Sequence, residues 1–390
     1  MINRKEIIDN SCKWLAFSGI QNIDDNNQYY GGINSWYSPD KCSYDFIYTE
    51  ITGYQLSTLV EAYNRTKDYV YIDQAILAAN WIINQALQKN GGVITRRYYN
   101  ESNDRFSEKN GLLCVFDSGM CLTGLMNLYS ITKQDNLLKV SIKIADFIIS
   151  SIDNSGKIYP LFDTKKKIFL CSTESWSTQA ATFLSKVCIG LYKLYTVTKD
   201  DKYISSINIV MDDVIRCQKS DGRFITNFNS GVTHVHPHCY TTEALIFLHS
   251  CNKNIVYKDA INLSVDWLDN HINNYSECIS SIVDKNCNSN KCERSDILSQ
   301  ILRIFLYARN TRISNNSSID NNILLLIKKL HQYQSQSNIK NEFGGIFYGV
   351  HEDGKVVNDI NSWSTQFFMQ AFFWLDQDIS GDKINVEFYV

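Results

Sequence analysis

Acidic and imidazole side chains recur along the chain, each beside the start of an apolar segment. Glu50 lies in Tyr-Thr-Glu-Ile-Thr-Gly-Tyr, Asp117 in Val-Phe-Asp-Ser-Gly and Glu174 in Ser-Thr-Glu-Ser-Trp, while His238 ends the sequence His-Val-His-Pro-His. Two carboxyl groups in one pocket can serve as proton donor and as base or nucleophile. An imidazole can transfer a proton near neutral pH. We therefore predict that Glu50, Asp117, Glu174 and His238 are catalytic residues.

Aromatic, imidazole and guanidinium groups accompany these acids at the same points of the sequence. Aromatic faces offer stacking surfaces for the apolar side of a sugar ring, and arginine binds carboxylates through paired hydrogen bonds. This combination is typical of a pocket for a hydroxyl-rich or anionic ligand. The predicted substrate-binding residues are Trp36, Trp176, His236, Tyr240, Arg294, His351 and Trp363.

The histidine triplet has three interpretations. On a strand, His234, His236 and His238 would share one face and could bind zinc, but Pro237 interrupts the alternation and the sequence implies no nearby carboxylate. Two stacked, hydrogen-bonded imidazoles would have a structural role. We favour the third interpretation, in which His238, with His236, transfers a proton or contacts a sugar. Neither a metal nor another cofactor is predicted.

Each acid also has a structural interpretation. Ser, Thr, Asp and Asn are ordinary N-caps of helices, and Glu in a first turn complements the helix dipole. Taken singly, Asp117 fits a helix cap better than a catalytic acid. Several polar and aromatic helix starts that converge on one concavity favour a functional site.

An internal repeat predicts the elements that position these residues. The motif Tyr63-x-x-Thr66-Lys67-Asp68 recurs at equal spacing from Tyr129 and Tyr195, and a degenerate copy begins at His249. An apolar helical segment precedes each copy and an amphipathic one follows it. Each copy is therefore predicted to be the turn of a helical hairpin.

Six apolar segments alternate with six amphipathic ones along the chain. The apolar segments should form an inner layer and the amphipathic ones an outer layer. Because the chain opens with an outer segment and ends with an inner one, these two can pair and close a ring. We predict an all-α protein whose residues 1–390 form one domain, an (α/α)6 toroid of six helical hairpins. The inner segments are expected at 49–65, 117–132, 174–197, 239–251, 294–310 and 362–376, and the outer segments at 3–18, 69–88, 135–152, 200–218, 256–272 and 318–334.

Short β-hairpins are predicted in the loops at one end of the ring. A turn glycine followed by β-prone residues appears after several outer segments, at 32–33, 91–94, 156–159, 221–224 and 344–347. The connections 19–48, 90–116 and 335–361 are also unusually long. Long loops in a compact domain are usually functional, so this end of the ring is expected to carry the site.

The composition limits the classes of partner. The chain has 390 residues, 44% of them hydrophobic and 20% charged, with a net charge of -3, which argues against disorder and against nucleic-acid binding through a basic face. No run has the apolar length of a membrane span, and the first residues lack the clean apolar stretch of a signal peptide. Twelve cysteines without close pairing suggest free thiols in a reducing compartment. We expect a cytoplasmic protein that binds a sugar or an oligosaccharide and neither nucleic acid nor membrane.

The predicted architecture resembles the six-hairpin (α/α)6 toroid enzymes of carbohydrate metabolism over essentially the whole chain. Residues 343–348, Phe-Gly-Gly-Ile-Phe-Tyr, and the later Asn361-Ser362-Trp363 look like the C-terminal part of the N-acylglucosamine 2-epimerase family, where an aromatic hairpin precedes the last inner helix. The unsaturated-uronide hydrolases share the toroid and use a carboxylic acid to direct water. That resemblance implies such a role for Asp117 and Glu174.

The leading functional hypothesis is cleavage of a glycosidic bond in an oligosaccharide, including one that contains a uronate. Glu50, Asp117 and Glu174 would supply the acid and the base or nucleophile. The first alternative is a sugar 2-epimerase or isomerase, in which His238 and His351 remove and return a proton beside a carbonyl.

Two further alternatives stay open. In a polysaccharide lyase, Tyr240 or His238 would be the base, and Arg294 or Arg96 would hold the carboxylate of a uronate. In a non-catalytic glycan-binding protein, the same pocket would bind without proton transfer. The charges alone do not separate these functions.

Overall fold

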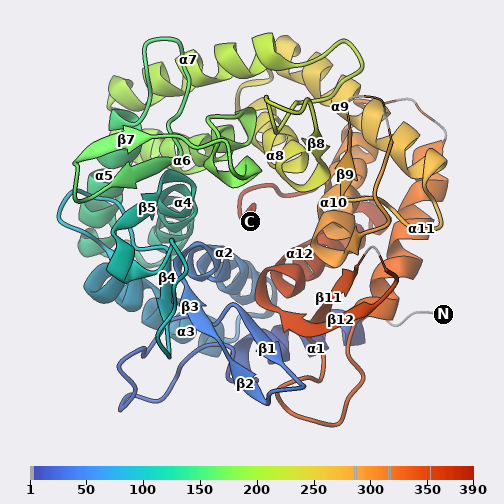
Figure 1. Cartoon of the computed structure of the whole chain (residues 1–390). Coiled ribbons are helices and arrows are strands. Elements are labelled where there is room, and N and C mark those ends of the chain that lie inside the picture. The colour runs from blue at the N-terminus through green and yellow to red at the C-terminus, as the bar shows by residue number, and fades with distance from the viewer. Residues whose placement is uncertain (1–3, 285, 287, 315, 317, 352) are drawn as a thin grey trace.

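The computed structural model describes residues 4–284, 286, 288–314, 316, 318–351 and 353–390. In these ranges the helices form an inner and an outer ring around one axis (Figure 1). Neighbouring inner helices contact one another around the ring, and the last of them, α12 (Ser362–Ile379), returns to contact the first, α2 (Thr49–Thr66). The first outer helix, α1 (Arg4–Phe17), packs against α12. The predicted (α/α)6 toroid is confirmed.

The inner helices coincide with the apolar segments of the sequence. A helix that is apolar on all sides is most stable when other elements cover it all round. These helices are buried along most of their length. Two predicted starts are wrong: the fourth inner helix begins at Val235, four residues before the predicted 239, and the third is treated next. The inner helices are α2 (Thr49–Thr66), α4 (Val115–Thr132), α6 (Cys188–Thr198), α8 (Val235–Asn252), α10 (Ser295–Thr311) and α12 (Ser362–Ile379).

The third inner helix begins later than the predicted residue 174. α6 starts at Cys188 and is preceded by a 3-10 turn, Thr182–Val187. Upstream, Ser175 and Thr178 form a reciprocal capping box around a second short 3-10 turn, and Gln179 then adopts an extended conformation. The polar residues that resemble a helix start therefore cap a single turn, and residues 172–181 form a loop at the rim of the ring.

The outer helices each bury one stripe of side chains. In α7 the buried residues Tyr203, Ile207, Val210 and Val214 follow helical spacing, while the opposite face is exposed. This pattern places α7 on the ring exterior. The outer helices are α1 (Arg4–Phe17), α3 (Tyr69–Trp81, continued by the π-helical turn Ile82–Ala86), α5 (Asp135–Ser150), α7 (Asp201–Cys217), α9 (Ile255–Asn274) and α11 (Ser318–Tyr333).

The repeated motif forms the turn between an inner and an outer helix, as predicted. Lys199 has a left-handed backbone (φ 57°), and its N–H donates to the carbonyl of Tyr195, which ends α6. The carboxylate of Asp200 then accepts from the N–H of Lys202 at 3.1 Å and caps α7. The same left-handed turn residue recurs at Lys67, Lys133, Lys253 and Arg312.

Short antiparallel strands occupy the end of the ring that faces the viewer in Figure 1. They are β1 (Trp36–Ser38), β2 (Ser43–Tyr44), β3 (Phe46–Tyr48), β4 (Arg96–Tyr98), β5 (Leu112–Cys114), β6 (Leu161–Asp163), β7 (Ile168–Leu170), β8 (Thr233–His234), β9 (Ile282–Val283), β10 (Glu293–Arg294), β11 (Ile346–Val350) and β12 (Val356–Asn361). The largest sheet has the order β10-β11-β12-β1-β2. Because β3, β5, β8, β10 and β12 run directly into inner helices, residues at these junctions lie at the mouth of the barrel.

The predicted glycine turns form single β-bridges, except at 344–347, where β11 begins. Ile158 bridges Ile152, and Phe224 bridges Gln218. Gly156 (φ 92°) belongs to one of these turns, and a Cβ there would lie 2.2 Å from the carbonyl oxygen of Ile209. The turn therefore packs directly on the backbone of the next outer helix, which only glycine allows.

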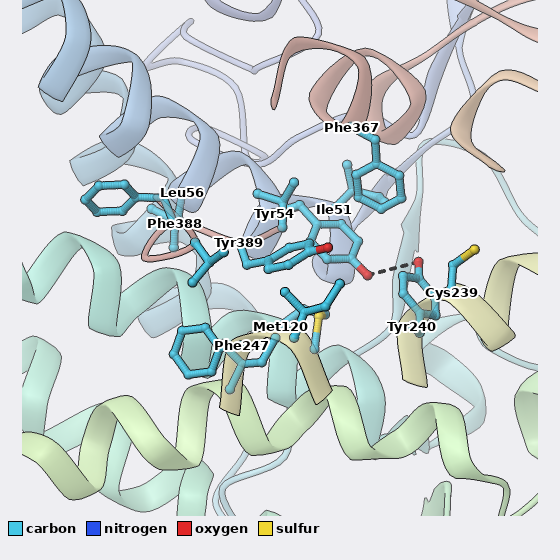
Figure 2. Packing of buried hydrophobic residues seen from close by; sticks show 14 of the residues in the cluster. Ile51, Tyr54, Leu56, Met120, Cys239, Tyr240, Phe247, Phe367, Phe388 and Tyr389 are labelled. Atoms are coloured by element: carbon cyan, nitrogen blue, oxygen red, sulfur yellow. Dashed lines mark hydrogen bonds between the residues drawn. The ribbon is translucent and has the colours of Figure 1, made fainter. Parts of the chain in front are cut away.

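The axis of the barrel is filled by side chains. Tyr54 of α2, Tyr240 of α8 and Phe367 of α12 meet there, together with Tyr389 from the segment after α12 (Figure 2). The hydroxyl groups of Tyr54 and Tyr240 are hydrogen bonded at 3.0 Å. The barrel is thus a packed core with a concavity at its mouth rather than an open channel. Within the described ranges, none of the helices has the length and apolar character that crossing a membrane requires.

Candidate active site

A cavity of about 200 Å³ opens at the barrel mouth, where the strands lead into the inner helices. It combines carboxyl, imidazole, guanidinium and aromatic groups from different hairpins. The predicted residues that line it are Glu50, Asp117, Trp176, His236, Tyr240, Arg294 and Trp363.

Four predicted residues lie outside this cavity. Glu174 is on the loop that replaces the predicted helix start, its side chain is 71% exposed, and it pairs with Arg105. His351 is exposed in the turn that follows β11. Trp36 packs behind Trp363, with ring centroids 6.2 Å apart.

His238, the fourth, is separated from the cavity by the helix itself. Because α8 begins at Val235, His236 and His238 project about 200° apart around the helix. His238 has no exposed surface, and its Nδ1 accepts the N–H of Phe224 at 3.3 Å. Its ring packs on Trp267 at 4.5 Å. The imidazole that faces the cavity is that of His236.

The side chains of the three histidines do not point toward a common site. His234 lies in β8, with Nδ1 3.0 Å from the hydroxyl of Thr226, and its neighbours His236 and His238 have the separate environments described above. In the part of the chain that is described, no group of three or more His, Cys, Asp or Glu side chains is placed to hold a metal ion.

Glu50 and Asp117 form a pair of buried carboxyl groups at the starts of the adjacent helices α2 and α4. Burial is the main cause that raises the pKa of both groups. For Glu50, hydrogen bonds from Tyr48 and Tyr54 oppose this increase. For Asp117, the charge of Glu50 raises the pKa further, and Oδ2 has no hydrogen-bond partner among the described residues. A proton shared by the pair therefore favours Asp117.

Arg96 is the cation beside this pair. Its position on β4, directly opposite Tyr48 on β3, brings its guanidinium to the cavity wall, 5.0 Å from the Tyr48 ring. Asp104 accepts a hydrogen bond from its Nη1 at 2.8 Å. The charge of Arg96 lowers the pKa of both Glu50 and Asp117. The sequence hypotheses used Arg96 only in the lyase alternative.

His236 is held as a neutral base. Its Nδ1 lies 2.6 Å from Oε1 of Gln300, and Gln300 Nε2 donates to Oε1 of Glu243 at 3.2 Å. Because the amide oxygen of Gln300 can only accept, Nδ1 of His236 carries the hydrogen and Nε2 keeps its lone pair. Burial lowers the pKa of His236 to about 3. The imidazole therefore offers an unprotonated Nε2 at neutral pH.

Asp296 positions two other lining residues. Its carboxylate accepts from Nε of Arg294 at 3.1 Å and from the indole N–H of Trp363 at 3.0 Å. Asp296 is fully buried, which raises its pKa, but the charge of Arg294, the neighbouring His236 and the hydrogen bonds from Arg294 and Trp363 together hold the pKa below its ordinary value. Sequence reasoning missed this residue, although it lies two positions after Arg294.

A buried ion network lies beneath the aromatic floor. Lys186 donates to Oε2 of Glu243 at 2.7 Å, and Arg303 donates to Oε1 of the same carboxylate at 2.7 Å. The ammonium of Lys186 lies 4.2 Å from the ring centroid of Tyr240. Burial lowers the pKa of Lys186 to about 8. A lone lysine in an apolar stretch was the sequence signal for this network, and it was missed.

Taken together, the cavity has a carboxyl group whose pKa is raised by burial and by the charge of Glu50, a second carboxyl group that accepts hydrogen bonds, and a neutral imidazole. These are the components of general acid–base catalysis on a neutral substrate. The aromatic rings of Trp176 and Trp363 line the same space.

Comparisons with solved structures place the chain among known toroids. A cellobiose 2-epimerase from Spirochaeta thermophila is 12% identical, with a TM-score of 0.77, over 97% of this chain and 96% of that one. A sugar epimerase from a ruminal bacterium is 12% identical, with a TM-score of 0.76, over 95% of this chain and 99% of that one. An unsaturated glucuronyl hydrolase specific for heparin is 11% identical, with a TM-score of 0.67, over 98% of this chain and 99% of that one.

No family model and no curated protein matches the sequence. At these identities the structural likenesses establish the shared fold, which is common to epimerases and to a hydrolase. The reaction has to be inferred from the residues of this cavity.

Proposed function

We propose that the protein is a carbohydrate-active enzyme that cleaves a glycosidic bond, with Glu50 and Asp117 as its acid–base pair. The observation that carries this proposal is the presence of two buried carboxyl groups in one cavity with unequal hydrogen bonding. Asp117 holds the proton and donates it to the leaving oxygen. Glu50, stabilised as a carboxylate, activates water or attacks the sugar.

The shape of the cavity supports a small sugar unit as substrate. Its volume of about 200 Å³ is below the range of roughly 300 to 1,000 Å³ typical of drug-sized ligands, so its enclosed part suits one sugar ring. Trp176 and Trp363 offer stacking faces. Arg96 and Arg294 favour a substrate that carries a carboxylate, such as a uronate.

Substitution of the pair tests this function. Asp117→Asn and Glu50→Gln keep the side-chain shape and should lower the rate of reducing-end release by about 10² to 10⁴-fold on any oligosaccharide that the wild type cleaves. Glu174→Gln is the matched control, because that carboxylate is exposed and outside the cavity. Folding is checked by circular dichroism. Full activity in Asp117→Asn and Glu50→Gln, or an equal loss in Glu174→Gln, would contradict the assignment.

A second candidate function is epimerisation or isomerisation of a sugar at the carbon beside its carbonyl. It is supported by the unprotonated Nε2 of His236 in the cavity and by the fold shared with sugar epimerases. His351 and His238, the predicted pair, lie outside the cavity. In this reaction His236 removes the proton from carbon 2 of the open-chain sugar while Asp117 protonates the carbonyl oxygen, which gives an enediol. Rotation of the enediol about its bond to carbon 3 presents the opposite face to the protonated His236, which returns a proton to carbon 2 while Asp117 takes its own proton back.

Solvent deuterium separates the two candidates. Epimerisation incorporates deuterium at carbon 2 of a free sugar, and His236→Ala should abolish this exchange, whereas the exposed His351→Ala should retain it. Release of a new reducing end without exchange supports bond cleavage. Sugar binding without either reaction in the wild type would contradict both candidates and leave a glycan-binding protein.

A further inference from the structure

A second cavity lies at the opposite end of the barrel from the candidate active site. Its volume is about 570 Å³, and the two cavities share no lining residue. Its walls are the last turns of α4, α6, α8 and α10, together with residues 383–387, which follow α12. The first cavity lies where inner helices begin and the second where they end.

The second cavity has an aromatic interior. Phe247 and Tyr307 are almost completely buried, with exposures of 4% and 2%, and both line the cavity. Tyr129 and Tyr192 are half-buried in its walls. Aromatic walls of this kind bind a flat or apolar body.

Positive charge exceeds negative charge in this cavity. It is lined by Lys133, Lys193 and Lys383, and Glu387 is the one carboxylate that lines it among the described residues. Lys133 is explained as the residue that ends α4 and complements the helix dipole. Lys193 and Lys383 have no such explanation, because one lies inside α6 and the other follows α12.

The ammonium group of Lys193 is held by a hydrogen bond, and the charge of Glu387 partly compensates it. It donates to the backbone carbonyl oxygen of Glu387 at 2.5 Å and lies 5.2 Å from the ring centroid of Phe247. No ion pair joins it to a carboxylate in the described ranges. Burial lowers the pKa of Lys193 to about 8. A bound anion would stabilise this partly desolvated cation.

We propose that the second cavity is a binding site for a small organic anion with an aromatic or apolar body. The anionic group pairs with Lys193, and the body packs on Phe247 and Tyr307. The volume lies within the usual range of small-molecule sites, about 300 to 1,000 Å³. This site is separate from the sugar chemistry proposed for the barrel mouth.

The occupant would touch a segment that continues to the core beneath the candidate active site. Residues 383–387 form a wall of the second cavity, and the carbonyl of Phe388 then accepts from Nε2 of Gln370 at 2.8 Å. The carbonyl of Val390 accepts from Lys186 at 2.8 Å. Binding should therefore slow amide hydrogen exchange in residues 384–390.

Calorimetric titration with naphthalene-1-sulfonate tests the site, with 1-naphthalenemethanol as the uncharged counterpart. We expect one bound sulfonate per chain and at least about tenfold weaker binding of the alcohol. Lys193→Met should weaken sulfonate binding by about tenfold, and Thr196→Trp, which fills the cavity from an exposed position, should abolish it. Lys199→Met is the matched control, since Lys199 ends the same helix outside the cavity.

Several results would overturn the proposal. These are no sulfonate binding by the wild type, equal binding of sulfonate and alcohol, or equal binding by the wild type and Lys193→Met. A loss of binding in Trp363→Ala would place the probe in the first cavity and also overturn it. Because the readout is binding rather than turnover, these outcomes do not depend on which sugar reaction the protein performs.

Discussion

At the scale of single residues, the Glu50 and Asp117 pair should cost stability as well as provide chemistry. The folded protein raises the pKa of Asp117, mainly by burial and then by the charge of Glu50. A group of this kind contributes its full stability below its unfolded pKa of about 3.9, and that contribution is lost as the pH rises through the higher folded pKa. Asp117 is therefore predicted to destabilise the fold increasingly toward alkaline pH.

Asp117→Asn removes the ionisable group and should be more stable than the wild type. The gain should grow as the pH rises above the unfolded pKa of about 3.9 and level off above the raised folded pKa of Asp117, because ionisation costs stability only in the folded protein. Urea unfolding at several pH values measures it. Glu174→Gln, at an exposed position, should give a difference that does not change with pH. If the stability difference between Asp117→Asn and the wild type does not change with pH, ionisation of Asp117 does not destabilise the folded protein.

Gln300 is predicted to act on the site through His236. Gln300→Met removes the acceptor that holds Nδ1–H and should lower activity by about 10 to 100-fold if His236 takes part in the reaction. The ¹⁵N shifts of the imidazole should report a mixture of tautomers. Gln366→Met is the control, since Gln366 is equally buried but donates to Gln55. If both variants lose the same activity, the effect is one of packing.

Residue types and spacing predicted well which segments of the chain meet at the cavity. They predicted less well which side chains of those segments point into it. Glu50 and Asp117 were found because each lies beside the start of an apolar segment, and both segments form inner helices that begin at the barrel mouth. The sequence analysis favoured His238 as the catalytic imidazole and placed it just before an inner segment expected to begin at 239. With the true start at Val235, the two imidazoles lie on different sides of α8. The four residues by which the helix begins earlier therefore decide which imidazole faces the cavity.

At the scale of elements, the helices were predictable because their apolar patterns differ by layer. The third inner helix is the exception, since Glu174 and its polar neighbours look like a helix start but cap one 3-10 turn. The sheet order β10-β11-β12-β1-β2 was not predictable, because it joins residues from opposite ends of the chain. Local sequence carries helix patterns, whereas such pairings depend on closure of the ring.

The left-handed turn residue between hairpins is predicted to be strained. Lys253 adopts φ 57° at the end of α8, a conformation that costs a non-glycine residue about 1 to 2 kcal/mol. Glycine removes this strain but loses more conformational entropy on folding than lysine does. The difference between the two effects should raise the free energy of unfolding of Lys253→Gly by about 0.5 to 1 kcal/mol. The control Lys139→Gly, at an exposed position inside α5, should lower it by about 1 kcal/mol. Chemical denaturation measures both, and destabilisation by Lys253→Gly would contradict the argument.

At the scale of the whole molecule, the ring is closed by contacts between its first and last hairpins. The hydroxyl of Ser11 on α1 donates to the carbonyl of Gly344 at 2.9 Å, and Gln334 donates to the carbonyl of Ile7 at 2.9 Å. These contacts join residues more than three hundred positions apart. Since the inner helices depend on one another for burial, loss of closure should destabilise the entire barrel.

Two glycines of the same loop region allow this dependence to be tested. Gly344 (φ 86°) and Gly354 (φ 80°) both have left-handed backbones, so alanine at either costs about 1 kcal/mol of strain. At Gly344 the new Cβ would lie 2.4 Å from the carbonyl oxygen of Asn10 on α1, whereas at Gly354 no described residue comes within 4 Å of it. Gly344→Ala should therefore lose about 1 to 3 kcal/mol more than Gly354→Ala. If closure stabilises the ring as a unit, amide hydrogen exchange in Gly344→Ala should accelerate in α4 and α8 as well as in α1 and α12. Acceleration confined to α1 would mean that the first helix packs on a barrel that is already stable without it.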